Sequence, residues 1–200
     1  MPAPEGFATR RRAALFDDLV TLMLAEGFAH LSVADIAQRL RCSKSTLYTL
    51  ADSKEQLATA AVTHFFKRAT REVEDRVAAS TDVRERVVIY LLAVGEALSV
   101  ASDQFMRDLD DFGPTHALYE RNTVAASARV AELISAGADA GVFRSVDAGF
   151  AADLTATMMR RIQRREVRDA TGLDDATAYR QLASILFAGI DAGNASPALP

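Results

Sequence analysis

The feature that most constrains this chain is a pair of short helical patterns joined by a turn, within residues 32–56. The first pattern begins at Ser32, whose hydroxyl can cap a helix while Asp35 reaches back as the second member of a capping box. Its apolar residues recur at the spacing of one helix face and are Val33, Ile36, Ala37 and Leu40. We therefore expect a helix that packs by one side only.

The second pattern follows a turn at residues 41–43, and Ser43 is a good N-cap for a helix from Lys44 to about Leu50. Leu47 and Leu50 are spaced to face inward. The side chains left for solvent are Lys44, Ser45, Thr46, Tyr48 and Thr49. A short helix with a small, hydrogen-bonding outer face suits the major groove of DNA, so we expect these residues and Ser43 to contact DNA.

This pattern resembles the helix-turn-helix of the tetracycline repressor family, in which an apolar helix and a turn precede S-K-x-T-L-Y and then S-K-E-x-L. The matching segments here are Ser43–Tyr48 and Ser53–Leu57. The resemblance implies an all-α fold, with an N-terminal three-helix DNA-binding head joined by a long helix to a helical ligand-binding and dimerisation domain. The predicted domains are residues 1–52 and 53–193, followed by a disordered tail at 194–200.

The chain departs from the family pattern at two places. The family usually has Gly in the turn, where this chain has Arg41, and Arg adopts a left-handed backbone only at a cost. We therefore expect a turn that is strained or shaped differently. The family also tends to end the second helix with an aromatic pair, where this chain has Leu50 and Ala51.

Composition agrees with a helical, globular protein. Of 200 residues only 5 are proline and 10 glycine, strand-like alternation does not occur, and 50% of the residues are hydrophobic. No apolar run approaches the length of a membrane span and no signal-peptide pattern is present. We expect a soluble, cytoplasmic protein in which the one cysteine, Cys42, is a turn or core residue rather than a redox sensor.

The net charge of −4 is unevenly distributed, because residues 1–67 carry +1 and residues 68–200 carry −5. A modest local excess of cations is enough for DNA binding if they gather on one face. The cations expected to contact the phosphate backbone are Arg10, Arg11, Arg12 and Lys54. For the three arginines, a solvated basic terminus is the alternative interpretation.

Helical patterns extend over most of the chain. The first is expected from about Thr9 to Glu26, with Gly27 ending it, while Phe28 and Leu31 fill the core of the head. The later helices are expected at about 53–79, 82–100, 103–111, 114–140, 147–170 and 174–192.

The family resemblance implies that the last two long helices form a dimer interface. Apolar residues on these helices make a stripe and a patch that fit this role: Phe150, Leu154, Met158, Ile162, Leu182, Ile185, Leu186 and Ile190. Burial inside one subunit is the competing interpretation. One short recognition helix contacts too few base pairs for genomic specificity. Two subunits would contact both halves of a palindrome.

A ligand pocket in the second domain is likewise implied by the resemblance. Methionine and aromatic residues suit an adaptable apolar cavity, and the candidates are Phe105, Met106, Leu109, Phe112, Tyr119, Met158 and Met159. Each of them could instead be ordinary core. We expect a hydrophobic or amphipathic effector, and no cofactor or metal.

Enzymatic activity is not expected. The three histidines are scattered, Cys42 has no partner for a thiolate site, and neither a phosphate-binding loop nor a nucleophile elbow occurs. The sequence therefore predicts a ligand-responsive, dimeric transcriptional regulator, most simply a repressor that a small molecule releases from a palindromic operator. The alternative is a helical protein-interaction module with a degenerate helix-turn-helix.

Overall fold

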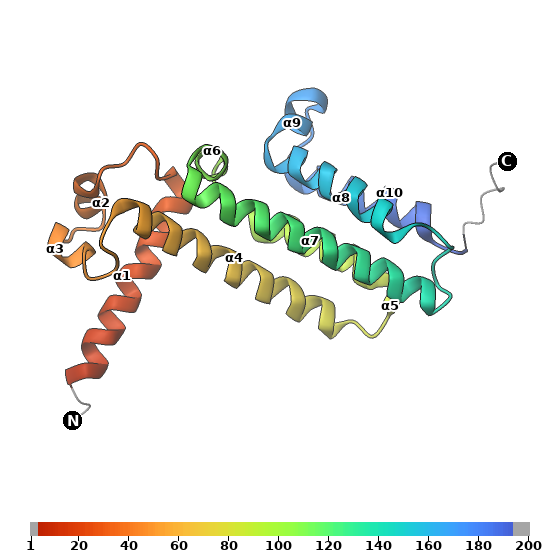
Figure 1. Ribbon diagram of the computed structural model, residues 1–200, viewed down its shortest axis with the longest axis horizontal. Coiled ribbons are helices and arrows are strands. Elements are labelled where there is room, and N and C mark those ends of the chain that lie inside the picture. Colours follow the sequence, from red (N-terminus) through yellow and green to blue (C-terminus); the bar gives the residue numbers. More distant parts are fainter. Residues whose placement is uncertain (1–3, 194–200) are drawn as a thin grey trace. The chain divides into compact units, whose positions relative to one another are not determined.

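The computed structural model describes residues 4–193, and side chains from residue 9 onward. Within this part ten α-helices follow one another without a strand (Figure 1), which confirms the predicted all-α fold. They are α1 (Pro4–Glu26), α2 (Val33–Arg39), α3 (Lys44–Leu47), α4 (Lys54–Ala79), α5 (Val83–Leu98), α6 (Asp103–Asp111), α7 (Gly113–Asp139), α8 (Ala148–Gln163), α9 (Glu166–Thr171) and α10 (Asp175–Ile190). The predicted disordered tail, residues 194–200, lies outside the described residues.

Most helix limits follow the sequence pattern. The helices α4 to α7 and α10 begin and end within two residues of the predicted positions, and α1 ends at Glu26 as expected although it begins earlier, at Pro4. In the described part of the chain, no single helix is long and apolar enough to cross a membrane, and only α5 and α6 counted together reach that length and composition.

The chain divides into two compact units. The first comprises Met1–Arg68 and Val100–Tyr119, and the second Ala69–Ser99 and Glu120–Pro200. The helices α1 to α3 and α6 thus belong to the first unit, α5 and α8 to α10 belong to the second, and α4 and α7 contribute to both. The predicted domain limits, at residues 52 and 193, stay a prediction.

The core of the first unit is built where α6 packs against the end of α1. Asp108 on α6 is 3% exposed, and its Oδ2 accepts hydrogen bonds from the backbone N–H groups of Phe28 (2.5 Å) and Ala29 (2.8 Å). Its Oδ1 accepts a third bond, from the amide of Gln104 (2.7 Å). A buried carboxylate with three donors is fully paired, so it fastens the chain that leaves α1 without the cost of an unpaired buried charge.

Aromatic side chains fill the space around this carboxylate. Phe28 is fully buried and meets the rings of Phe105 and Phe112 edge-on, with both centroids 5.8 Å away. Leu31 is 2% exposed. The expectation that Phe28 and Leu31 fill the core is confirmed.

In the second unit, α10 lies between α5 and α8 and packs against both (Figure 1). Tyr179 of α10 is 2% exposed and sits so close to Gly95 of α5 that a Cβ there would lie 2.9 Å from its ring. Its hydroxyl accepts a hydrogen bond from the buried amide of Gln163 on α8 (3.0 Å). This tyrosine therefore links all three helices.

The single helix expected over 147–170 is wrong, because the structure has α8 and α9 with a break between them. At the break Arg165 adopts a left-handed backbone with φ 64°, although neither glycine nor proline marks the place in the sequence. Its guanidinium forms an ion pair with Asp175 at the start of α10, and Arg168 lies 3.7 Å from the same carboxylate. The break thus coincides with ion pairs to Asp175. Helical periodicity describes neighbours in one helix and does not predict such contacts.

Gly27→Ala should strongly destabilise the protein. Gly27 has φ +81°, and a Cβ there would lie 2.5 Å from Gln104 Cγ and 2.6 Å from Asp108 Oδ2. Gly141→Ala is a matched control, since Gly141 has φ +70° with nothing within 4 Å of the added atom. In urea unfolding we expect a loss of about 1 kcal/mol for the control and about 3 kcal/mol for Gly27→Ala. Equal losses would show that the close approach of α6 costs nothing.

Candidate nucleic-acid interface

The start of α2 has the predicted capping box. The Ser32 hydroxyl accepts a hydrogen bond from the Asp35 N–H (3.2 Å), and Asp35 Oδ2 accepts one from the Ser32 N–H (2.8 Å). The Ser32 hydroxyl also donates to Asp35 Oδ2 (2.6 Å), and this bond together with the one from the Ser32 N–H lowers the pKa of the exposed Asp35 carboxyl below its ordinary value. Ile36 and Ala37 are buried, so α2 packs by one face as its periodicity indicates.

The turn after α2 is strained in the expected way. Arg41 has φ 51°, in the left-handed region that glycine tolerates and other residues rarely adopt. Two backbone hydrogen bonds close the turn. The Arg41 N–H donates to the Gln38 carbonyl (3.1 Å), and the Cys42 N–H donates to the Ala37 carbonyl (2.9 Å). Cys42 is half-buried, and its burial raises the pKa of the thiol, so the group stays protonated at neutral pH.

The helix α3 begins where predicted but is shorter. Ser43 caps it by accepting from the Thr46 N–H (3.1 Å), and its hydroxyl also bonds to the hydroxyls of Ser45 (2.7 Å) and Thr46 (2.8 Å). The α-helix ends at Leu47 rather than near Leu50, because the N–H groups of Thr49 and Leu50 bond three residues back, although that of Tyr48 still reaches Lys44. Residues 48–50 therefore continue as a tight turn.

The outer face of α3 and the following turn is polar. Leu47 is fully buried and Leu50 is half-buried, so these two leucines hold the segment against the rest of the first unit. The predicted DNA-contacting residues are exposed apart from Thr46, which is half-buried: Ser43, Lys44, Ser45, Thr46, Tyr48 and Thr49. Tyr48 has 47% of its surface exposed, which is unusual for a large ring and leaves it available to a partner.

The predicted phosphate contacts differ in their surroundings. Arg10, Arg11 and Arg12 are exposed, and they lie inside α1 because that helix begins at Pro4. The ammonium of Lys54 donates to the carbonyl of Ala29 (2.6 Å), so this side chain also holds the loop between α1 and α2. No local pattern predicts that bond, because it joins residues 25 positions apart.

The predicted pocket residues fall into both units. Those in the first unit are Phe105, Met106, Leu109, Phe112 and Tyr119, and all but the half-buried Phe112 are buried. Met158 and Met159 belong to the second unit, where Met159 is part of the hydrophobic core. Whether any of the seven lines a ligand pocket stays a prediction.

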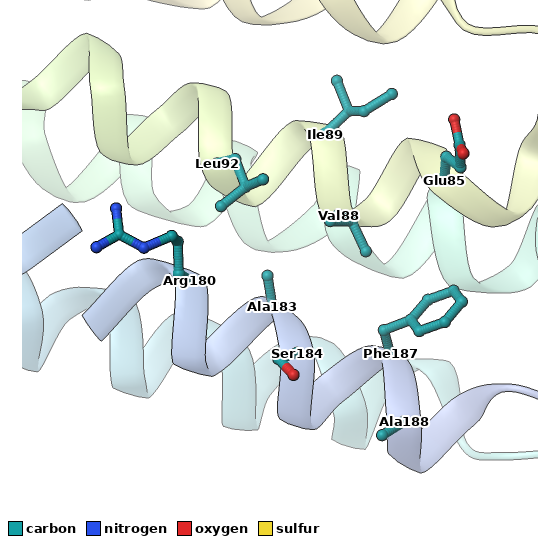
Figure 2. Close-up of a pocket in the computed structure, with 9 residues that line it drawn as sticks. All are labelled: Glu85, Val88, Ile89, Leu92, Arg180, Ala183, Ser184, Phe187 and Ala188. Carbon is teal, nitrogen blue, oxygen red and sulfur yellow. The ribbon is translucent and has the colours of Figure 1, made fainter. Parts of the chain in front are cut away.

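A groove of about 470 Å³ lies elsewhere, between α5 and α10 of the second unit (Figure 2). Val88 and Leu92 of α5 point toward α10, and Phe187 and Ala183 of α10 point toward α5. The full lining is Glu85, Val88, Ile89, Leu92, Arg180, Ala183, Ser184, Phe187 and Ala188. Its walls are mostly apolar, with Glu85 near one end and Arg180 near the other (Figure 2). Sequence reasoning missed it, although the lining residues of α5 have the spacing of one helix face.

The predicted dimerisation residues divide by exposure. Phe150 is 71% exposed, Ile185 69% and Leu154 53%, all unusually open for large apolar side chains. Met158 and Leu182 are half-buried. The remaining three pack inside the second unit: Ile162, Leu186 and Ile190. Phe150, Leu154 and Ile185 are thus the predicted residues whose side chains a partner could contact.

Comparison with known proteins agrees with this geometry. Residues 15–61 match the model of the bacterial regulatory proteins of the tetR family, which confirms the resemblance seen in the motif. These residues include α2, the strained turn and α3. No curated protein matches the sequence.

Several solved structures have a similar fold. A putative transcriptional regulator from Saccharomonospora viridis, in complex with choline, is 19% identical, with a TM-score of 0.74 over 92% of this chain and 98% of its own. A TetR-family regulator from Agrobacterium tumefaciens is 14% identical, with a TM-score of 0.72 over 90% and 100%. AibR, in complex with isovaleryl coenzyme A and operator DNA, is 20% identical, with a TM-score of 0.65 over 88% and 98%. At such low identity these likenesses concern the fold.

Ser43→Ala should destabilise the protein by about 1 kcal/mol, because it removes the cap of α3. Ser45→Ala is the matched control, since the Ser45 hydroxyl bonds to the Ser43 hydroxyl rather than to a backbone N–H. Urea unfolding of both variants measures the difference. A control that loses as much as Ser43→Ala would contradict the role assigned to the cap.

Proposed function

We propose that this chain, which carries the DNA-binding segment and the fold of the tetR family of bacterial transcriptional regulators, acts as a ligand-responsive dimeric repressor. The matched family consists of regulators rather than enzymes, as the sequence predicts. The observation that carries the proposal is the capped α3, with Leu47 buried beneath it and an exposed polar face. Such a face is what base edges in a major groove require.

In this proposal α3 and the turn after it enter the major groove of a palindromic operator. The residues that contact DNA there are Ser43, Lys44, Ser45, Thr46, Tyr48 and Thr49, with Arg10, Arg11, Arg12 and Lys54 on the phosphates. Their hydroxyl, ammonium and phenol groups can pair with base edges or phosphate oxygens. Repression by occlusion is the simplest outcome, since a protein bound at a promoter excludes the polymerase. Such a regulator works in the cytoplasm.

We place the dimer interface on the exposed faces of α8 and α10. Phe150, Leu154 and Ile185 account for half of the large apolar side chains that are exposed in the described part of the chain. Apolar area of this kind is costly in water and is covered when two copies meet about a twofold axis. Two copies also supply the two α3 helices that a palindrome needs.

The effector that we propose is a hydrophobic or amphipathic small molecule. The groove between α5 and α10 supports this, because Val88, Leu92 and Phe187 offer an apolar wall and Arg180 can pair with an anionic group. The predicted pocket residues of the first unit, around Phe105, offer a second location. Release from DNA requires that the effector bind better to an arrangement of the two DNA-binding surfaces that does not fit the operator.

A protein-interaction module with a degenerate helix-turn-helix is the alternative. The strained turn and the missing aromatic pair after α3 are the features that favour it. The two functions differ in DNA binding, because a degenerate module would bind every sequence weakly and equally.

Lys44→Ala and Tyr48→Ala should each weaken operator binding about tenfold while leaving thermal unfolding unchanged, because both side chains are exposed on α3 and the turn after it. Arg121→Ala is the control, since it removes one exposed cation from α7 in the second unit. The measurement is a gel shift over a salt series, on DNA that flanks the protein's own gene.

Unchanged affinity in both variants would contradict the assigned recognition surface. Weak binding of the unmodified protein that is equal for all sequences would favour the interaction module. The same gel shift, repeated with a series of amphipathic compounds, tests for an effector that releases the DNA.

Phe150→Lys and Ile185→Lys should each weaken dimerisation about 100-fold. Each substitution occurs in both subunits of a twofold dimer, so it buries two unpaired charges in the interface. Val124→Lys is the control, since Val124 is 66% exposed but lies on α7. Sedimentation velocity over a concentration series measures the effect. Dimers that persist in both variants, or that dissociate in the control, would contradict this interface.

A further inference from the structure

We infer that Arg41, the left-handed residue of the turn between α2 and α3, binds a phosphate of the DNA backbone. The inference rests on the proposed function, because it adds a residue to the same DNA-binding surface.

The first observation is that Arg41 is held in a conformation that its side chain disfavours. Its φ of 51° is fixed by the hydrogen bonds that close the turn, in which the Arg41 and Cys42 N–H groups reach back to α2. Glycine would adopt this backbone without strain. A residue that keeps such strain at an exposed position calls for a compensating interaction.

The second observation is a comparison within the same chain. In the described residues only two positions other than glycine have positive φ, and both are arginines, Arg41 and Arg165. The guanidinium of Arg165 forms an ion pair with Asp175, so its strained backbone is accompanied by a contact inside the protein. The side chain of Arg41 is exposed, and the described part of the chain gives it no ion pair. Its guanidinium is therefore available to a partner outside the subunit.

The third observation is where Arg41 stands. It lies two residues before Ser43, the cap of α3, and the N-terminal end of a recognition helix is the end that meets DNA, between two phosphate backbones. A neighbouring cation, Arg39, is already paired with Glu26. An exposed guanidinium at this position matches a phosphate, which it can bind through two parallel hydrogen bonds.

The contact should concern the backbone and not a base, because Arg41 belongs to the turn rather than to the face of α3. A phosphate contact contributes equally to affinity on every DNA sequence, and its contribution falls as the salt concentration rises. Loss of Arg41 should therefore weaken binding to operator and random DNA by the same factor, about fivefold to tenfold at moderate salt. It should also lower the slope of log affinity against log salt by about one.

Three variants test this inference by gel shift on operator and random DNA, with thermal unfolding measured alongside. Arg41→Gly removes the strain and the charge, so its melting temperature should not fall although its DNA affinity does. Arg41→Gln keeps a side chain on the strained backbone without the charge and should lose affinity equally. Arg41→Lys keeps the charge and should retain most of the salt slope.

The outcomes separate the inference from the function on which it rests. If the unmodified protein binds its operator selectively but Arg41→Gly and Arg41→Gln bind with unchanged affinity and slope, the phosphate contact is wrong and the regulator stands. Loss of operator binding alone, with binding to random DNA unchanged, would also overturn it, since that pattern belongs to a base contact. A protein that binds neither operator nor random DNA would defeat both.

Discussion

The helix-turn-helix depends on one buried carboxylate that comes from a distant part of the chain. Asp108 lies 80 residues beyond Phe28, whose backbone N–H donates to its carboxylate, and it holds the loop between α1 and α2 together with the Lys54 ammonium. Without it the buried N–H of Phe28 and the partly buried N–H of Ala29 would lose their acceptor, or the loop would move toward water. Because α2 begins only a few residues later, the carboxylate also sets where α2, the turn and α3 can lie. Gly27 is the complementary constraint, since it alone leaves room for the carboxylate and for Gln104.

This bond changes what counts as the DNA-binding part of the molecule. By sequence order α6 belongs with the helices that follow α4, but its packing places it in the first unit with α1. The head is therefore assembled from two stretches of chain, joined by residues of the second unit. The helices α4 and α7 contribute residues to both units, so the backbone connection between them is helical at two places. A change in the second unit has a covalent route to the first through either helix.

Sequence reasoning succeeded where the structure is decided by neighbours in the chain. The capping box of Ser32 and Asp35, the cap at Ser43 and the end of α1 at Gly27 all rest on bonds within four residues, so residue types and spacing predict them. It failed where a distant residue decides: the break at Arg165 accompanies an ion pair with Asp175, and the role of Asp108 rests on a contact across the fold. It placed the exposed face of α3 but not its length. The aromatic and methionine residues that suit a pocket also suit a packed core, and composition does not distinguish the two.

The hydroxyl groups at the start of α3 have a further consequence. The Ser43 hydroxyl is bonded to those of Ser45 and Thr46, and each of the three can donate one hydrogen and accept another. A hydroxyl changes its bonding direction by rotation about a single bond, with little loss from the backbone. A recognition surface made of such rotors tolerates the exchange of a base donor for a base acceptor better than a surface of fixed amides would. In the proposed regulator, an operator that exchanges such a base therefore needs no matching change in the protein.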